Sequence, residues 1–222
     1  MPQSACTDHR TRVGADRRQR TRHKLLQTAF QLFAEQGLNA PIIDQVIRQA
    51  GLSRGTFYNH FRCERELFLA VAAEVSNEII GAVDTQVLNH DNPVERLACG
   101  VALCVQLARR YPIIAAFLAN GGAQAVFAGG NASKAIARDV QLGLQSGVFT
   151  VSDPALAIDL VLGPVLCTFG SLLKRPLSDS YVAELSAAIL RSLGIEPTEA
   201  ARVAAQDYGQ PQPHDESLFI GL

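Results

Sequence analysis

Tryptophan is absent from this chain of 222 residues, methionine occurs once, and only 6% of the residues are aromatic. A packed interior must therefore be built mainly from aliphatic side chains, and a hydrophobic content of 48% is enough for one large domain or two small ones. The five cysteines form no C-x-x-C pair, and the five histidines are dispersed. We therefore expect no disulfide framework, no metal site and no bound cofactor, and scattered thiols are typical of a reducing cytosol.

An apolar segment of the kind that directs secretion is also missing, because residues 1–24 are polar and rich in arginine. The uncharged stretch 111–133 is interrupted by proline, glycine and asparagine, and the apolar run 160–173 is short and contains Gly163-Pro164. Neither stretch has the ~20 consecutive apolar residues that a membrane span requires. We expect a cytoplasmic protein that does not enter a membrane, with 160–173 as a buried helix.

The charges are unevenly distributed. Residues 1–65 hold eleven Lys and Arg against five Asp and Glu, whereas residues 66–222 hold nine against sixteen. This division indicates a basic, phosphate-facing N-terminal region attached to an acidic body.

The segment from Ala50 to Phe61 reads as a tight turn followed by a very short helix. Gly51 supplies the backbone freedom for the turn, and Ser53 is placed to cap the helix that follows. Phe57 and Phe61 share one face, which leaves a polar opposite face. The sequence therefore predicts a helix that is anchored on one side and can contact DNA with the other.

Helical spacing of apolar residues recurs along most of the chain, and no segment shows sustained alternation, so the predicted fold is all-α. Three helices, over 19–36, from about Pro41, and after Gly51, form an N-terminal head. A long helix over 64–89 joins it to a body. The further predicted helices cover residues 93–110, 113–118, 133–145, 154–174 and 178–193, with a short one beyond Pro197.

Four regions follow from this pattern. Residues 1–17 are expected to be a mobile basic arm, 18–63 a helix-turn-helix head, 64–204 a larger helical domain, and 205–222 a tail in which 206–214 is of doubtful order. Two interpretations of the arm stay open: a solvated tail, or a segment that reaches into the minor groove.

A family resemblance rests on three groups of residues: Leu25-x3-Ala29-x2-Leu32-Phe33-x3-Gly37, then Ala50-Gly51-Leu52-Ser53-x-Gly55-Thr56-Phe57-Tyr58-x-His60-Phe61, then Glu66-Leu67. Over about fifty residues their order and gaps resemble the DNA-binding domain of the TetR family of bacterial repressors. The resemblance implies a homodimer that binds double-stranded DNA at a palindromic operator and is released when a small molecule enters the helical C-terminal domain. It therefore makes residues 64–204 the expected ligand-binding and dimerisation domain.

The resemblance also implies roles for single residues. Ser53, Thr56, Tyr58 and His60 stand where the family contacts phosphates. Arg54 and Asn59 are candidates for reading base edges, and Arg favours guanine. Gly55 is small enough for the backbone to approach the groove.

The chain departs from the family pattern at both ends of this element. Ile42 and Pro41 replace a frequent Ser/Thr cap and a frequent Thr, and Gln45 replaces a common acidic residue. Cys63-Glu64 stands where a polar cap followed by Lys is usual, which removes one expected phosphate contact. Cys63 is open to two interpretations, a redox-sensitive thiol near DNA or an inert thiol beside two glutamates.

In the body, the glycine-rich stretch 111–131 is the expected irregular segment beside a ligand cavity. Candidate cavity residues are Cys104, Phe117, Phe127 and Cys167, and a simple core role is an equal alternative. No charged residue is clearly placed inside, so we expect an apolar effector. The two last long helices carry excess apolar surface for a dimer interface, with candidates Leu160, Leu166, Leu173, Leu185 and Ile189.

Two rival functions come from other classes. A small helical enzyme lacks support, since no nucleophile–base pair, carboxylate dyad or phosphate loop appears at recognisable spacing. A helical adaptor that binds proteins through its acidic body is the second rival. We expect a regulator and not an enzyme.

Overall fold

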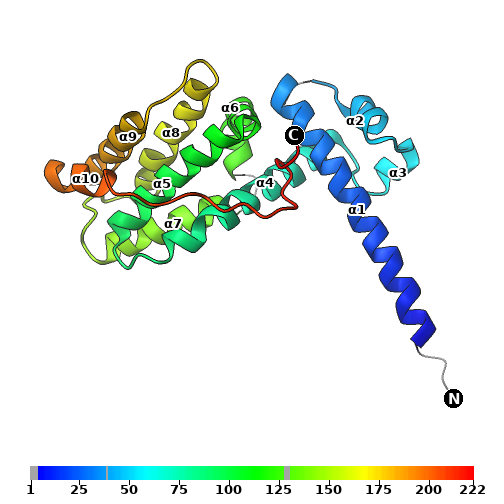
Figure 1. The fold of residues 1–222 in the computed structure, drawn as a ribbon, viewed down its shortest axis with the longest axis horizontal. Helices are drawn as coiled ribbons and strands as arrows, with labels where there is room; N and C mark the ends of the chain where they lie inside the picture. The colour runs from blue at the N-terminus through cyan, green and yellow to red at the C-terminus, as the bar shows by residue number, and fades with distance from the viewer. Residues whose placement is uncertain (1–4, 39, 128–130) are drawn as a thin grey trace.

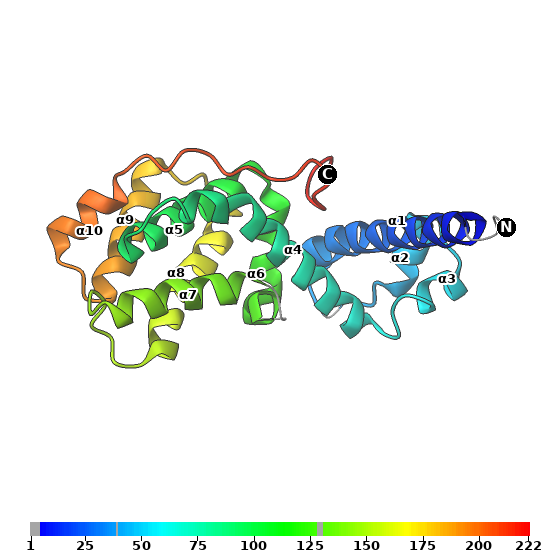
Figure 2. The same cartoon turned by 90° about the horizontal axis from the view of Figure 1, so that it is seen from below.

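The structure, a computed structural model, describes residues 5–38, 40–127 and 131–222, apart from the side chains of 5–12, 123, 124, 126 and 127. Within these residues the regular structure is helical and no strand occurs, which confirms the all-α prediction. The molecule is elongated, with a small head at one end and a larger helical body at the other (Figures 1 and 2).

The head consists of α1 (Ala5–Gln36), α2 (Ile43–Ala50) and α3 (Arg54–Tyr58). The prediction of a mobile arm is corrected here. α1 begins at Ala5 and not near residue 19, so residues 5–17 are helical, and residues 1–4 lie outside the described residues. The N-terminal half of α1 projects beyond the rest of the head (Figure 1). Gly37, at a φ of 75°, ends the helix with its N–H bonded to the carbonyl of Phe33.

The body contains seven helices among the described residues. They are α4 (Glu64–Val87), α5 (Pro93–Arg110), α6 (Pro112–Phe127), α7 (Asn131–Gln145), α8 (Pro154–Leu172), α9 (Asp179–Ser192) and α10 (Pro197–Ala204). Local signals define several starts: Asn92 and Asp153 cap α5 and α8 from the residue before a proline, and Ser178 caps α9. The predicted bounds of α4, α5, α7, α8 and α9 agree to within a few residues.

The glycine-rich stretch was expected to be irregular, and this is corrected. Most of it forms α6, whose backbone departs from helical geometry at Gly122 (φ 53°, ψ −146°). Small apolar residues favour a helix here, and a single glycine in the left-handed region is enough to break it.

Four phenylalanines join the head to the body. Phe30 packs edge-on against Phe117 at 5.2 Å between ring centroids, Phe33 packs against Phe68 at 5.3 Å, and Phe68 lies 5.8 Å from Phe117. All four are buried. Since they come from α1, α4 and α6, this aromatic cluster fixes the direction in which α1 leaves the body.

The C-terminal tail (residues 205–222) is not the loose segment that the sequence suggested. It runs from α10 along the body to the head–body junction, as the red trace in Figures 1 and 2 shows. Leu218 and Phe219 are fully buried and Tyr208 nearly so, while the N–H of Gln212 donates to the carbonyl of Ala82 at 2.9 Å. The tail is held by contacts with residues that are distant in the sequence, and the periodicity of its own apolar residues does not reveal such contacts.

Candidate nucleic-acid interface and ligand cavity

The turn between α2 and α3 is held by backbone hydrogen bonds. Gly51 adopts a left-handed conformation (φ 63°), its N–H donates to the carbonyl of Arg48, and the N–H of Leu52 donates to the carbonyl of Ile47. This pattern is a Schellman motif, which requires a residue that tolerates positive φ. Gly51 therefore sets the angle between the two helices.

Ser53 begins α3. Its hydroxyl oxygen accepts from the N–H of Thr56 at 3.1 Å and lies 2.8 Å from the Thr56 hydroxyl. Both side chains are thus ordered at a helix N-terminus, where the free N–H groups favour an anion.

The two faces of α3 differ as the sequence predicted. Phe57 and Phe61 are buried at 0% and 2% exposure, with rings 6.1 Å apart, whereas the Tyr58 side chain beside them is half exposed. The polar residues lie on the outside, with Ser53, Arg54, Gly55 and Asn59 exposed and Thr56 and His60 half-buried. The apolar face anchors α3, which leaves its other face free for a partner.

Arg54 forms an ion pair with Asp44, a residue for which the sequence predicted no role. Its guanidinium donates to the Asp44 carboxylate at 2.6 Å, and this hydrogen bond raises the pKa of Arg54 above its ordinary value. Both side chains are about 70% exposed, so solvent screens the pair and the arginine can exchange partners easily.

A groove of about 510 Å³ joins α1 to the end of α3. It is lined by Gly14, Arg17, Arg18, Thr21, Thr56, Asn59 and His60. Burial lowers the pKa of His60, and the positive charges of Arg18 and Arg22 lower it further. Arginines from α1 and polar residues around α3 therefore face one basic groove.

The sequence left open whether the arginines of residues 1–17 contact DNA, and it gave no role to Arg18 or Thr21. Residues 14, 17, 18 and 21 follow helical i, i+3, i+4, i+7 spacing, so a signal for one helical face was present. Residues 1–17 were assigned to an arm because their apolar residues are not periodic, whereas residues 18 and 21 were already placed in the head.

Gly55 has no structural requirement within the chain itself. A Cβ atom added there meets only the Ser53 hydroxyl oxygen, at an ordinary 3.8 Å, and the backbone φ is not positive. The reason for glycine at this exposed position is thus not found in the folded chain.

The departures from the family pattern are visible in the caps. Ile42 precedes α2, makes no side-chain cap and is completely buried. Cys63 precedes α4 as an exposed free thiol and also makes no cap hydrogen bond. The redox hypothesis for Cys63 stays a prediction.

A second feature is a cavity of about 80 Å³ between α4, α5, α7 and α8. Its walls are mainly apolar, with Ile80, Val83 and Val87 on α4 and Cys104 on α5. Burial raises the pKa of the Cys104 thiol to about 12, so this cysteine behaves as a small neutral hydrophobe.

Of the four predicted cavity residues, only Cys104 lies there. The prediction for Phe117 is wrong, because this residue belongs to the aromatic cluster. The prediction for Cys167 is also wrong, because this residue is exposed on α8. The Phe127 side chain lies outside the described residues.

The expectation of a cavity without charged residues is also wrong. Asp84, Arg96 and Asp139 line one end. Arg138 donates to both oxygens of Asp84 at 2.8 and 3.0 Å and to Asp139 at 2.8 and 2.9 Å, and Arg96 lies 3.4 Å from Asp139. Both arginines are thus already neutralised by carboxylates.

The predicted interface residues lie mostly on partly open surface. Leu173 is 48% exposed, and Leu160, Leu166 and Leu185 are half-buried, but Ile189 is 2% exposed and packs inside the subunit core. By length and composition α8 is apolar enough to cross a membrane, and a third of its most apolar 18-residue stretch is buried. Its outer face also carries Gly163, beside which a Cβ atom would meet nothing.

The geometry defines a helix-turn-helix protein with a separate helical body, and comparison with known families agrees. The family described as "Bacterial regulatory proteins, tetR family" matches residues 25–71, and "Tetracyclin repressor-like, C-terminal domain" matches residues 92–206. The chain belongs to the TetR family of bacterial regulatory proteins.

Curated relatives match in the head. The HTH-type transcriptional regulator AcrR of Shigella flexneri is 32% identical over 68 residues, 31% of this chain and 31% of AcrR, and SrpR of Pseudomonas putida is 38% identical over 53 residues, 24% of this chain and 25% of SrpR. The matched regions thus span a third or less of these relatives.

Among solved structures, RolR without ligand is 28% identical, with a TM-score of 0.70 over 86% of this chain and 100% of RolR. RolR in complex with resorcinol is 27% identical, with a TM-score of 0.65 over 88% of this chain and 98% of that chain. The similarity to RolR therefore includes both head and body.

The glycine at position 55 generates a prediction. Gly55→Ala should leave the free energy of unfolding unchanged or raise it by up to about 1 kcal/mol, because alanine favours helix and meets no clash. The same variant should bind duplex DNA at least tenfold more weakly, because its methyl group occupies the space between backbone and groove. Urea unfolding and fluorescence anisotropy measure the two effects. Unchanged DNA affinity would contradict this role of Gly55.

Proposed function

We propose that this protein is a dimeric, sequence-specific transcriptional regulator, a repressor that a small molecule releases from a palindromic operator. One observation carries the proposal: an exposed polar face of α3 stands on buried Phe57 and Phe61, beside a basic groove formed with α1. Membership of the TetR family favours this function over the enzyme and adaptor alternatives.

The division of labour within the interface follows from chemistry. Arg54 and Asn59 project from the exposed face of α3 and are proposed to read base edges, with Arg54 exchanging Asp44 for guanine. Ser53, Thr56, Tyr58 and His60 are proposed to contact phosphates. To these we add Arg17 and Arg18 of α1, which extend the phosphate-facing surface away from α3.

The body cavity is the proposed effector site. RolR, whose structure contains resorcinol, resembles this chain over 88% of its residues, with a TM-score of 0.65. The walls suit a small, largely apolar ring, and the carboxylates of Asp84 and Asp139 can accept a hydrogen bond from a hydroxyl group. Because Arg96 and Arg138 are already paired, an anionic effector is disfavoured.

Release requires motion, since 80 Å³ is too small for a ring compound without displacement of a wall. α4 supplies one wall and also carries Phe68 of the aromatic cluster that holds α1. An effector that favours a displaced α4 shifts the population away from the arrangement in which the two heads reach half-sites about 34–36 Å apart.

The proposed dimer forms through the outer faces of α8 and α9. Leu156, Leu160, Gly163 and Cys167 follow one another at helical spacing on exposed or half-exposed surface of α8. Burying this apolar stripe against a second copy removes it from water, and glycine permits close helix approach.

Two arginine substitutions distinguish the proposed base-edge contact of Arg54 from the proposed phosphate contact of Arg18. Arg54→Ala should relax preference at one base position, because a base-edge contact is lost. Arg18→Ala should weaken binding to all duplexes alike and reduce the slope of log affinity against log salt by about 1. Selection of duplexes from a random pool, followed by salt titration, measures both. Equal effects of the two variants on sequence preference would contradict the assignment.

Filling the cavity should abolish effector binding. A Cβ atom at Gly100 meets only Val87 of the opposite wall, at 3.8 Å, so the side chain of Gly100→Leu enters the cavity. With resorcinol as the probe, the melting temperature of the wild type should rise and that of Gly100→Leu should not.

The matched control is Gly81→Leu, at an exposed glycine of α4 with open space beside it. It should respond to resorcinol as the wild type does. An equal rise in Gly100→Leu would place the ligand elsewhere, and no rise in the wild type would contradict this ligand class.

The proposed interface predicts that Gly163→Glu separates the subunits, because a charge would be buried between two apolar helices. Sedimentation at micromolar concentration should give the mass of two chains for the wild type and of one chain for Gly163→Glu. Gly81→Glu, at an equally open glycine outside the interface, should stay dimeric. A dimeric Gly163→Glu would move the interface away from α8.

A further inference from the structure

The tail connects parts of the molecule that are far apart in the sequence. It leaves α10 at the far end of the body and ends beside α1, and both views in Figures 1 and 2 show this course. The family match in the body ends at residue 206, so nearly all of the tail lies beyond the matched region.

The tail is bonded to one face of α4. The N–H of Leu218 donates to both oxygens of the Glu78 carboxylate at 2.9 and 3.0 Å, the N–H of Gln212 donates to the carbonyl of Ala82 at 2.9 Å, and the amide of Gln86 donates to the carbonyl of Gln210. Glu78, Ala82 and Gln86 are spaced four residues apart, so the tail lies along a single stripe of the helix.

Buried side chains secure the two ends of this stripe. Near α10, the Tyr208 ring packs at 5.4 Å from His90, and its hydroxyl donates to the carbonyl of Val203. Near the head, Phe219 is fully buried with its ring 4.9 Å from Tyr111. Burial of these rings gives the tail a fixed course along the body.

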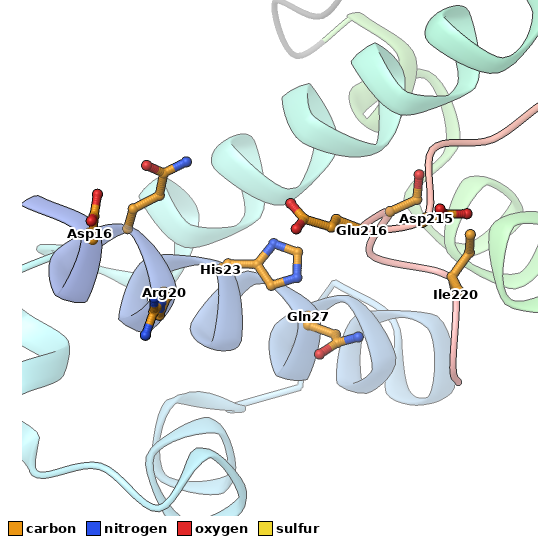
Figure 3. A pocket seen from close by; sticks show the side chains of 9 residues that line it. Asp16, Arg20, His23, Gln27, Asp215, Glu216 and Ile220 are labelled. Atoms are coloured by element: carbon orange, nitrogen blue, oxygen red, sulfur yellow. The ribbon is translucent and has the colours of Figure 1, made fainter.

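The end of the tail faces the head. A groove of about 560 Å³ is lined on one side by α1 residues that include Arg20, His23 and Gln27, and on the other by the tail. Figure 3 shows Asp215, Glu216 and Ile220 of the tail across this groove from the α1 side chains. The end of the tail therefore lies across a groove from α1, the first helix of the head.

The opposite side of α4 faces the cavity. Ile80, Val83 and Val87 line the cavity, whereas Glu78, Ala82 and Gln86 hold the tail. Any displacement of α4 away from the cavity is thus directed against the tail.

We propose that the tail is an intramolecular clamp that holds α4 in place beside α1 and so keeps the head in its operator-binding arrangement. This inference rests on the proposed function. Loosening the clamp shifts the population toward the released arrangement without any effector, because the tail's contacts stabilise one position of α4.

The test uses the full chain and the duplex that the wild type selects. Phe219→Ala removes the ring that anchors the tail near the head, and the control Leu222→Ala removes a side chain that is 46% exposed in the same tail. Hydrogen exchange of residues 78–87 should become at least fivefold faster in Phe219→Ala, and operator affinity should fall at least threefold. Leu222→Ala should match the wild type in both measurements.

A second variant covers the case in which Phe219→Ala does not fold. Gln212→Pro removes the N–H that bonds Ala82 but leaves every buried side chain in place, and the residue already precedes Pro213 in an extended segment. It should change exchange and affinity in the same direction by a smaller factor.

The outcomes separate the clamp from the proposed function. If the wild type selects no duplex, the proposed function fails, while hydrogen exchange still reports whether the tail restrains α4. Wild-type exchange in Gln212→Pro and in folded Phe219→Ala overturns the clamp. Faster exchange with unchanged operator affinity overturns its role in positioning the head.

Discussion

The packing of Phe30, Phe33, Phe68 and Phe117 is the interaction on which the rest of the structure depends. These rings come from α1, α4 and α6, and their edge-on and tilted contacts leave little freedom in the angle between head and body. The position of α3 relative to the cavity is therefore set by residues that line neither the cavity nor the groove beside α3. Because α4 lines the cavity and also contributes Phe68 to this cluster, the cluster links the cavity to α1 of the head.

Local features of the chain were predictable where neighbouring residues determine them. Phe57 and Phe61 lie four apart beside a glycine turn and a serine cap, so their burial and the exposure of Arg54 followed from spacing alone. The same is true of α5, which begins at Asn92-Pro93 and ends at paired arginines. Helix caps and apolar periodicity act over a few residues, and the sequence displays them directly.

Long-range features were not predictable in this way. Phe117 in an uncharged helix looked like a cavity residue, because hydrophobicity does not distinguish a wall from a junction. Asp84 and Asp139 lie more than fifty residues apart and are bridged by Arg138. The polar end of the cavity was therefore not predictable from the sequence. The prediction of doubtful order in the tail was wrong for the same reason, because the N–H of Leu218 donates to Glu78, which is distant in the sequence.

Glu78 shows how closely the tail and α4 are joined. Burial raises the pKa of this carboxyl to about 7, with the charge of Glu74 adding to the effect, even though the N–H of Leu218 favours the ionised form. The N–H of Leu218 thus has as its acceptor a carboxyl group whose ionised form is disfavoured by burial. α4 is therefore constrained on three sides: by the aromatic cluster at its N-terminal half, by the cavity wall, and by the tail. Because a rigid helix cannot move at one of these contacts without straining the other two, α4 is the element through which we propose that the cavity acts on the head.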